Sequence, residues 1–167
     1  MLNAASFTYR RATPADLLTI CELAQQLHSL HHEARPDIYA PATAEFARDQ
    51  ALWLPSLDPK NEATQAAFLA QRGNLAVGFV TAVVLPQNNP ILQPLTVCRI
   101  GSIVVLEAHR GCGVGGGLMR LAESWGAGLG ATDFRLNVWK FNEPASRLYE
   151  DLGYEVRAFE LGKRLGG

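Results

Sequence analysis

Residues 103–117 read IVVLEAHRGCGVGGG, and this stretch decides the fold. Branched apolar residues typical of a buried strand are followed by five glycines within residues 111–117. A helix is then predicted over about residues 114–129 from the apolar stripe Val114, Leu118, Leu121, Ala122, Trp125 and Leu129. Glycines permit tight turns, and the first amides of a helix are unpaired donors at the positive end of its dipole. The segment therefore predicts a phosphate-binding loop, to which Arg110 adds a positive charge.

Two common nucleotide motifs do not account for this loop. A Walker A loop needs Lys and then Ser or Thr after its last glycine, whereas Gly116 is followed by another glycine and a leucine. Gly111, Gly113 and Gly116 do match the dinucleotide pattern G-x-G-x-x-G. That pattern also needs an acidic residue about 20 positions on, at the end of the next strand. The predicted strand ends in NVWK (137–140), which contains no acid, so a dinucleotide site is not favoured.

The rest of the chain predicts a mixed α/β (α+β) domain. Alternating apolar residues and turn signals predict strands over residues 7–11, 66–71, 75–85, 96–106, 134–139 and 154–161. Helical spacing and caps predict helices from Thr13 to before Pro36, around 44–52 and over 145–152. Neither a repeat nor a long linker interrupts the 167 residues, so we expect one domain spanning residues 1–167.

Composition limits the partners and the compartment. The net charge is −1 and the pI is about 6.4, which does not favour binding to nucleic acid or to an anionic membrane. Apolar runs stay well short of the roughly 20 residues that a membrane span needs, and the N-terminus lacks a signal-peptide pattern. The three cysteines, Cys21, Cys98 and Cys112, are far apart, which fits a reducing cytoplasm better than disulfides or zinc.

Two motifs together point to a family. Arg110, Gly113 and Gly115 form Arg-x-x-Gly-x-Gly directly before a predicted helix, and residues 142–154 read NEPASRLYEDLGY. These resemble the two signatures of the GNAT acyltransferases (Gcn5-related N-acetyltransferases), the second being N-x-x-A-x-x-x-Y-x-x-x-G-F/Y. The resemblance covers about residues 68–160. It implies a mixed, mostly antiparallel central sheet, flanked by helices and splayed at the acyl-coenzyme A site.

The resemblance also implies acetyl-CoA as cosubstrate and indicates how it is held. The pantetheine arm is expected along the strand at Ile103, Val104 and Val105. The pyrophosphate is expected on backbone amides of the glycine loop, formed by Arg110, Gly111, Cys112, Gly113, Val114, Gly115 and Gly116. Asn142 either bonds the coenzyme or caps the following helix, and the residues favour neither interpretation.

For the chemistry, Tyr149 matches the family position whose hydroxyl protonates the leaving thiolate. A tyrosine pKa near 10 keeps it an acid at neutral pH, although a purely structural core tyrosine is the alternative. Several family members supply a base from a glutamate on the strand before the loop. The counterparts here are Gly101 and Ser102, so Ser102 is expected at most to hold a water, or the base lies elsewhere.

The acceptor site is the least defined. His31 and His32 lie late in the first predicted helix, a region that the family uses to line the acceptor site. With Tyr39 they are the candidates to line it, although solvated or structural histidines are the commoner outcome. His28 and His32 are four residues apart but lack a third ligand, so no metal is expected. We expect a primary amine on a small molecule, or secondarily on a peptide or protein, to attack the thioester directly. A non-catalytic acyl-CoA-binding module or regulator is the alternative, and a homodimer is a candidate assembly because dimers are common in the family.

Overall fold

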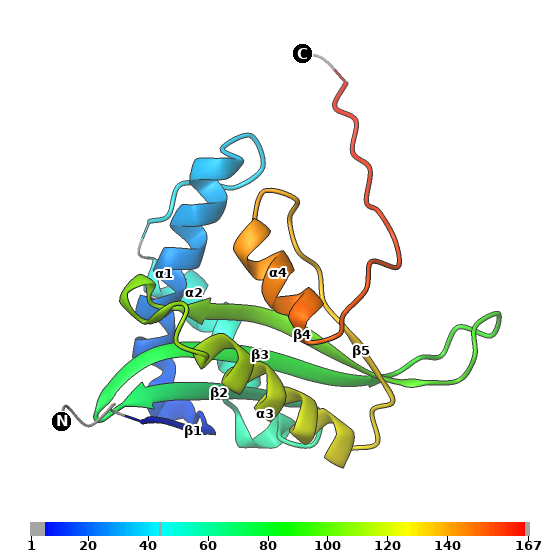
Figure 1. Ribbon diagram of the computed structural model, residues 1–167, viewed down its shortest axis with the longest axis horizontal. Helices are drawn as coiled ribbons and strands as arrows, with labels where there is room; N and C mark the ends of the chain where they lie inside the picture. Colours follow the sequence, from blue (N-terminus) through cyan, green and yellow to red (C-terminus); the bar gives the residue numbers. More distant parts are fainter. Residues whose placement is uncertain (1–5, 44, 166–167) are drawn as a thin grey trace. The chain divides into compact units, whose positions relative to one another are not determined.

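The computed structural model describes residues 6–43 and 45–165, and its strands form one sheet in the order β1-β2-β3-β4-β5 (Figure 1). The strands are β1 (Phe7–Arg11), β2 (Gln65–Arg72), β3 (Leu75–Pro86), β4 (Thr96–Val105) and β5 (Asp133–Arg135). The first four pair antiparallel, while β4 and β5 run parallel. The predicted mixed, mostly antiparallel sheet is therefore confirmed.

Four α-helices accompany this sheet within the described residues. They are α1 (Leu17–Ala34), α2 (Phe46–Trp53), α3 (Val114–Gly128) and α4 (Glu143–Asp151), each close to its predicted place. None of them is long and apolar enough to cross a membrane. The chain forms two compact units that divide after Asn137, so α4 belongs to the second unit and all five strands to the first.

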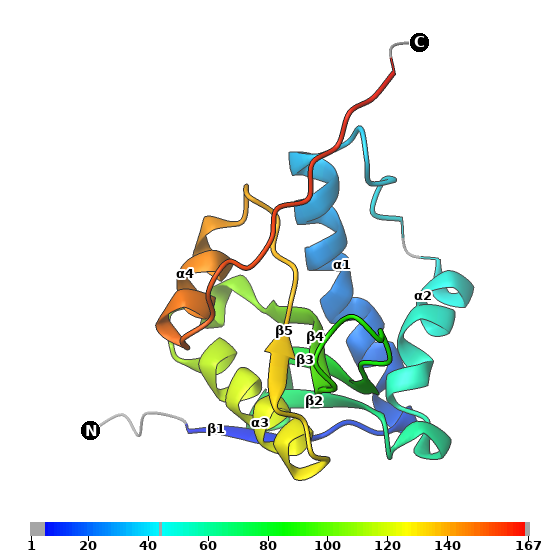
Figure 2. The same cartoon turned by 90° about the vertical axis from the view of Figure 1, so that its right-hand side faces the viewer.

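In the first unit, α1 and α2 cover one face of the sheet and α3 covers the other (Figure 2). On the α1 face, Ile20, Leu69, Phe79 and Val104 form a buried apolar core with Trp53, whose ring meets that of Phe79 edge-on at 5.3 Å. Apolar residues recur at helical spacing on α1 and at alternate positions on the strands, so both faces of this interface become apolar. The burial of these side chains fixes the sheet that carries the loop before α3.

Two glycines allow α3 to lie close to the other face of the sheet. A Cβ at Gly126 would lie 2.7 Å from the Sγ of Cys98, which is buried on β4. A Cβ at Gly117 would lie 2.3 Å from the ring of Tyr9 on β1. Side chains at these positions would push the helix away from the sheet. Part of the glycine content of this segment therefore serves packing.

Two predicted strands differ from the structure. The strand predicted over 134–139 ends at Arg135, and the strand predicted over 154–161 is wrong, since these residues adopt no regular secondary structure. A strand needs a neighbour for its backbone groups, and alternating side chains alone do not supply one. Among the described residues, β5 pairs with β4 only from Asp133 to Arg135, and Phe159 and Leu161 are 85% and 92% exposed.

Candidate functional site

The glycine loop between β4 and α3 turns through two left-handed residues. Gly111 has φ +71° and Gly113, directly before the first residue of α3, has φ +81°. Side chains other than glycine strongly disfavour this region of φ. A Cβ at either position would meet nothing within 4 Å, so the backbone conformation, rather than crowding, requires glycine here. The predicted turn from strand to helix is confirmed.

The backbone amides of residues 111–116 make no well-formed hydrogen bond to the described part of the chain. The first hydrogen bond of the helix runs from the amide of Gly117 to the carbonyl of Gly113, at 3.0 Å. Consecutive free donors at the start of a helix form a cradle for an anion, and the helix dipole adds to its positive potential. The structure thus brings the residues predicted for the pyrophosphate into one loop, while their contact with a coenzyme stays a prediction.

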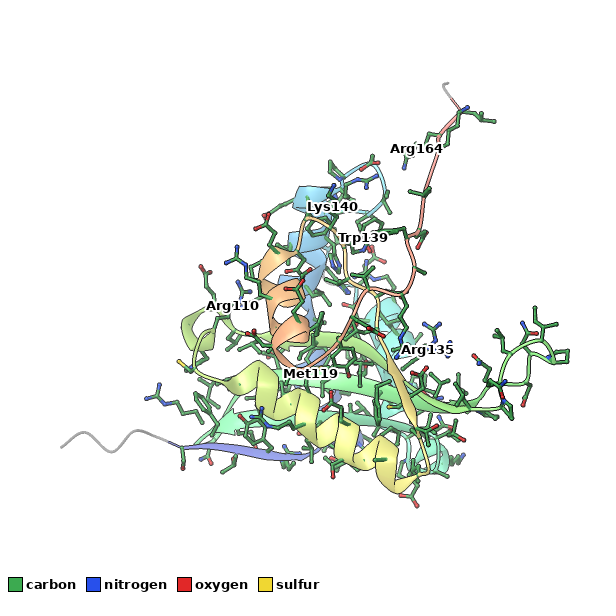
Figure 3. All side chains as sticks on the ribbon, turned by 45° about the vertical axis from the view of Figure 1, so that its right-hand side comes forward. Arg110, Met119, Arg135, Trp139, Lys140 and Arg164 are labelled. Atoms are coloured by element: carbon green, nitrogen blue, oxygen red, sulfur yellow. The ribbon has the colours of Figure 1, made fainter. Side chains whose placement is uncertain are left out.

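Two arginines flank this loop. Arg110, labelled in Figure 3, donates from Nε to the carbonyl of Val105 at 3.1 Å, which holds its guanidinium beside the end of β4. Arg120 was not singled out from the sequence, yet its Nη1 lies 3.2 Å from where a Cβ of Gly116 would be. Residues four apart on a helix are neighbours, so the position of Arg120 one turn after Gly116 was the available signal. Both guanidiniums can add charge-assisted hydrogen bonds to a phosphate.

The strand that leads into the loop has a free edge. β4 pairs with β5 only at Val97, Cys98 and Arg99, and from Ile100 onward no described strand lies on that side. On its other side, residues 103–105 pair with residues 78–80 of β3. The predicted splay is therefore present, and the edge at Ile103 to Val105 can accept an extended ligand by strand-like pairing. This edge runs directly toward the glycine loop.

Gly101 and Ser102, the counterparts of a strand glutamate, both adjoin Thr81 of β3. The amide of Ser102 donates to the Thr81 Oγ1 at 2.9 Å, and a Cβ at Gly101 would lie 2.5 Å from the same atom. No side chain, and hence no carboxylate, fits at position 101 without moving Thr81. Ser102 is half-buried, and the idea that it holds a water remains a prediction.

The residues predicted for the acceptor gather at the C-terminal end of α1. The ring of His31 stacks on that of Tyr39, with centroids 4.7 Å apart, and the His32 Nδ1 lies 2.8 Å from the Tyr39 carbonyl oxygen. Burial lowers the pKa of His31, which favours its neutral imidazole. His28 instead stacks on Trp53. The described residues contain no group of three His, Cys, Asp or Glu that could hold a metal ion.

The second unit presents Asn142 and Tyr149 on and before α4. The Asn142 Oδ1 accepts from the Ala145 amide at 3.4 Å, so Asn142 caps the helix while its amide nitrogen stays available to a ligand. Tyr149 is the buried residue of α4, and burial raises the pKa of its phenol to about 12. Its hydroxyl makes no hydrogen bond within the described residues and is not among their buried unpartnered atoms, so the oxygen itself is reached by solvent. Gly153, with φ +89°, ends the helix as predicted.

Solved structures resemble the chain over nearly its whole length. They include a tetramutant of the BH1408 protein from Bacillus halodurans (22% identity, TM-score 0.82, 95% of this chain and 99% of that one). A second is aminoglycoside N-acetyltransferase AAC(6')-Iy in complex with CoA (20% identity, TM-score 0.74, 99% of this chain and 98% of that one). A third is aminoglycoside antibiotic 6'-N-acetyltransferase AAC(6')-IG from Acinetobacter haemolyticus (20% identity, TM-score 0.68, 95% of this chain and 99% of that one). At these identities the likeness establishes the fold alone.

Sequence comparison supplies the family. No curated protein matches the chain significantly. The model of the acetyltransferase (GNAT) family matches residues 25–154, a range that includes β4, the glycine loop, α3 and the Asn142-to-Tyr154 segment. With its splayed mixed sheet, its glycine loop of free amides and this match over most of its length, the chain belongs to the acetyltransferase (GNAT) family.

Proposed function

We propose that the protein transfers an acetyl group from acetyl-CoA to a primary amine on a small molecule. The observation that carries this proposal is the row of free amides over residues 111–116, next to the open edge of β4. A coenzyme A ester has a polyanionic end and an extended arm with amide groups. A loop of anion-binding donors followed by an unpaired strand edge complements both parts.

In this proposal, the amides of the glycine loop bind the pyrophosphate, and Arg110 and Arg120 add charge-assisted hydrogen bonds. The backbone edge at Ile103 to Val105 holds the pantetheine arm. A backbone amide of β4 that points to the open edge stabilises the oxyanion that develops on the thioester carbonyl. Asn142, whose amide nitrogen its capping role leaves available, contributes a donor to the coenzyme.

The reaction forms one C–N bond and breaks one C–S bond. The neutral amine attacks the thioester carbonyl, the tetrahedral intermediate expels the thiolate, and Tyr149 gives its proton to that sulfur. The proton lost by the amine leaves through a water held near Ser102, and solvent returns a proton to Tyr149, so the products are an amide and the free thiol of CoA. The raised pKa of Tyr149 keeps its phenol protonated at neutral pH, as an acid requires.

The main alternative is an acyl-CoA-binding module or regulator without turnover. The lack of a carboxylate at position 101 leaves room for that role. Tyr149 has a buried ring and a hydroxyl that no described residue engages, which favours the enzyme, because binding alone does not require a placed proton donor. The aminoglycoside N-acetyltransferases among the similar structures act on small molecules, which favours a small acceptor over a protein amino group. His31, His32 and Tyr39 are proposed to line its site.

We also propose a homodimer in the cytoplasm. Val156, Phe159, Leu161 and Leu165 near the C-terminus are 72–92% exposed, and a second copy would shield them from water. Residues 154–161, which have strand-like composition but no described partner strand, could then pair with an edge of that copy. The three cysteines are free, which suits a reducing compartment.

Ligand protection and thiol release test the proposed function together. Acetyl-CoA at about 100 times its Kd should stabilise the protein by about 2.7 kcal/mol. That raises Tm by roughly 5–10 °C for a chain of this size. NAD is the control and should not protect. Release of CoA thiol with one member of a primary-amine panel establishes transfer. Protection without thiol release from any amine would instead support the binding-module alternative, and protection by NAD alone would refute the coenzyme assignment.

A further inference from the structure

A small cavity on the sheet is lined by two arginines. It measures about 160 Å³ and is lined by Leu85, Pro86, Gln87, Val97, Arg99 and Arg135. Arg99 on β4 and Arg135 on β5 are direct register partners in the parallel pair, so their side chains leave the same face of the sheet. They are the last pair before the two strands diverge. The cavity therefore lies where the splay of the sheet begins.

The two arginines differ in what already neutralises them. Arg135 donates from Nε to the carboxylate of Asp133 and from Nη1 to the Gln87 Oε1 at 3.1 Å, so it is held in one orientation (Figure 3). The side chain of Arg99 makes no hydrogen bond or ion pair with any other described residue. With Arg99, Arg135 and Asp133 counted together, the cavity keeps one uncompensated positive charge. The N–H donors of the Arg99 guanidinium are free to hold a carboxylate by two parallel hydrogen bonds.

A second cavity shows why this charge matters. It is larger, about 530 Å³, and includes Arg10 and Asp16 in its lining. Those two side chains form an ion pair at 2.7 Å, so they neutralise each other. Glu22 also lines this cavity, so its lining has no surplus positive charge and does not favour an anion. The cavity at Arg99 is smaller than most sites for a whole ligand, which span roughly 300–1,000 Å³, but its size suits a single anionic group.

We propose that Arg99, which lines this cavity with Arg135 and Gln87, binds a carboxylate of the acceptor, so that the amine substrate is an amino acid or a related amino carboxylate. The inference rests on the proposed function and adds the acceptor's chemical class. The positive cavity repels an ammonium group, so the reacting amine lies at the other end of the molecule. Ile103, where the thioester arm is expected to begin its pairing, is four residues from Arg99, roughly 13 Å along the strand. The carboxylate and the amine are therefore separated by several bonds.

This charge also separates the protein from its structural neighbours. An aminoglycoside or a diamine carries several ammonium groups, and one of them would meet Arg99 at close range. Like charges in contact disfavour binding. We therefore expect poor acetylation of aminoglycosides by this chain, although similar structures include aminoglycoside N-acetyltransferases.

A matched set of acceptors tests the inference. The set is 6-aminohexanoate, its neutral analogue 6-aminohexanamide, hexylamine and 1,6-diaminohexane, each assayed by release of CoA thiol. The carboxylate should exceed the carboxamide in kcat/KM by ~10- to 100-fold, the range expected for charged hydrogen bonds. Arg99→Gln should abolish that preference, and Arg99→Lys should retain part of it. Arg72→Gln, at an exposed arginine near the end of β2, is the control and should keep the full preference.

A binding measurement separates this inference from the proposed function. Calorimetry with 6-acetamidohexanoate and CoA-saturated protein detects the carboxylate site without turnover, and Arg99→Gln should weaken that binding ~10-fold or more. Thiol release with equal rates for the carboxylate and the carboxamide would overturn the inference and leave the transferase standing. Arg99-dependent binding without acetylation of any amine would support the carboxylate site and refute the transferase. Binding that Arg99→Gln leaves unchanged refutes the site.

Discussion

Substitution of Gly113 by alanine tests whether the conformation of the glycine loop, rather than its composition, forms the coenzyme site. Gly113 has φ +81° and ψ 0° directly before α3, and a Cβ there would meet nothing within 4 Å. The cost of Gly113→Ala is therefore that of a left-handed alanine, about 1–2 kcal/mol, with no steric clash added. The reduced freedom of the unfolded chain offsets only part of this. Tm should fall by roughly 2–8 °C.

The same strain predicts the loss of coenzyme affinity. Where the alanine loop relaxes to a right-handed turn, the amides of residues 111–116 no longer converge, and binding must restore the left-handed residue. Strain that is released by this relaxation no longer lowers Tm and must be supplied on binding instead, so the apparent Kd of acetyl-CoA rises by up to ~5- to 30-fold for 1–2 kcal/mol. Thermal unfolding followed by circular dichroism gives the first quantity, and titration calorimetry gives the second.

Gly128→Ala is the matched control for this experiment. Gly128 lies at the end of α3, lacks a positive φ, and has open space where a Cβ would go. Alanine there should be neutral or stabilise the helix by up to about 1 kcal/mol, with acetyl-CoA affinity unchanged. Should Gly113→Ala match this control in both Tm and Kd, the backbone argument for the loop would be refuted.

Four further predictions concern the acid, the second arginine, the packing of α3 and the C-terminus. Tyr149→Phe should lower kcat by ~10²- to 10⁴-fold without changing the Kd of acetyl-CoA, and equal turnover would remove Tyr149 from the mechanism. The protonated phenol is the active form, and because burial raises its pKa to about 12, its ionisation should cause no alkaline loss of wild-type activity below about pH 10. Arg120→Gln should raise the Kd of acetyl-CoA by roughly 10-fold and weaken its salt dependence in calorimetry; an unchanged Kd would place Arg120 outside the site. Gly126→Ala should destabilise the fold by about 1–3 kcal/mol in urea unfolding, since its Cβ meets Cys98, and stability equal to that of Gly128→Ala would contradict the packing. Removal of residues 155–167 should convert a dimer to a monomer in light scattering, whereas a dimer that survives truncation would assign the interface elsewhere.

The sequence predicted elements well where periodicity and chain neighbours act together. β2 and β3 form a hairpin around Gly73, whose φ of +60° suits a tight turn, so composition and topology agree. The glycine loop was predictable for the same reason, since the residues that form it are consecutive. Residues 136–139 and 154–161 show the converse. Their alternation is strand-like, yet strand formation depends on a partner that local sequence does not specify.

The glycine run also illustrates how one composition can meet several demands. Gly111 and Gly113 provide left-handed turns, Gly116 lies beside Arg120, and Gly117 permits the contact of α3 with Tyr9. The match to G-x-G-x-x-G thus combines positions that serve different purposes. A pattern of residue types records where glycine is needed but not why. The distinction requires the φ angles and the neighbours of each position, which only the structure supplies.

The pairing of Arg99 with Arg135 could not be read from the sequence, because it depends on the register of two strands that are separated by the whole of α3. Once that register is known, β4 has a positive group at each end of its open edge, with Arg99 at the start and Arg110 after its last residue. A chain of net charge −1 has no general attraction for anions, so these charges act locally. The donor end suits the phosphates of CoA. If the acceptor end holds a carboxylate, the same strand aligns both substrates, and the amine is presented to the thioester between two fixed anions.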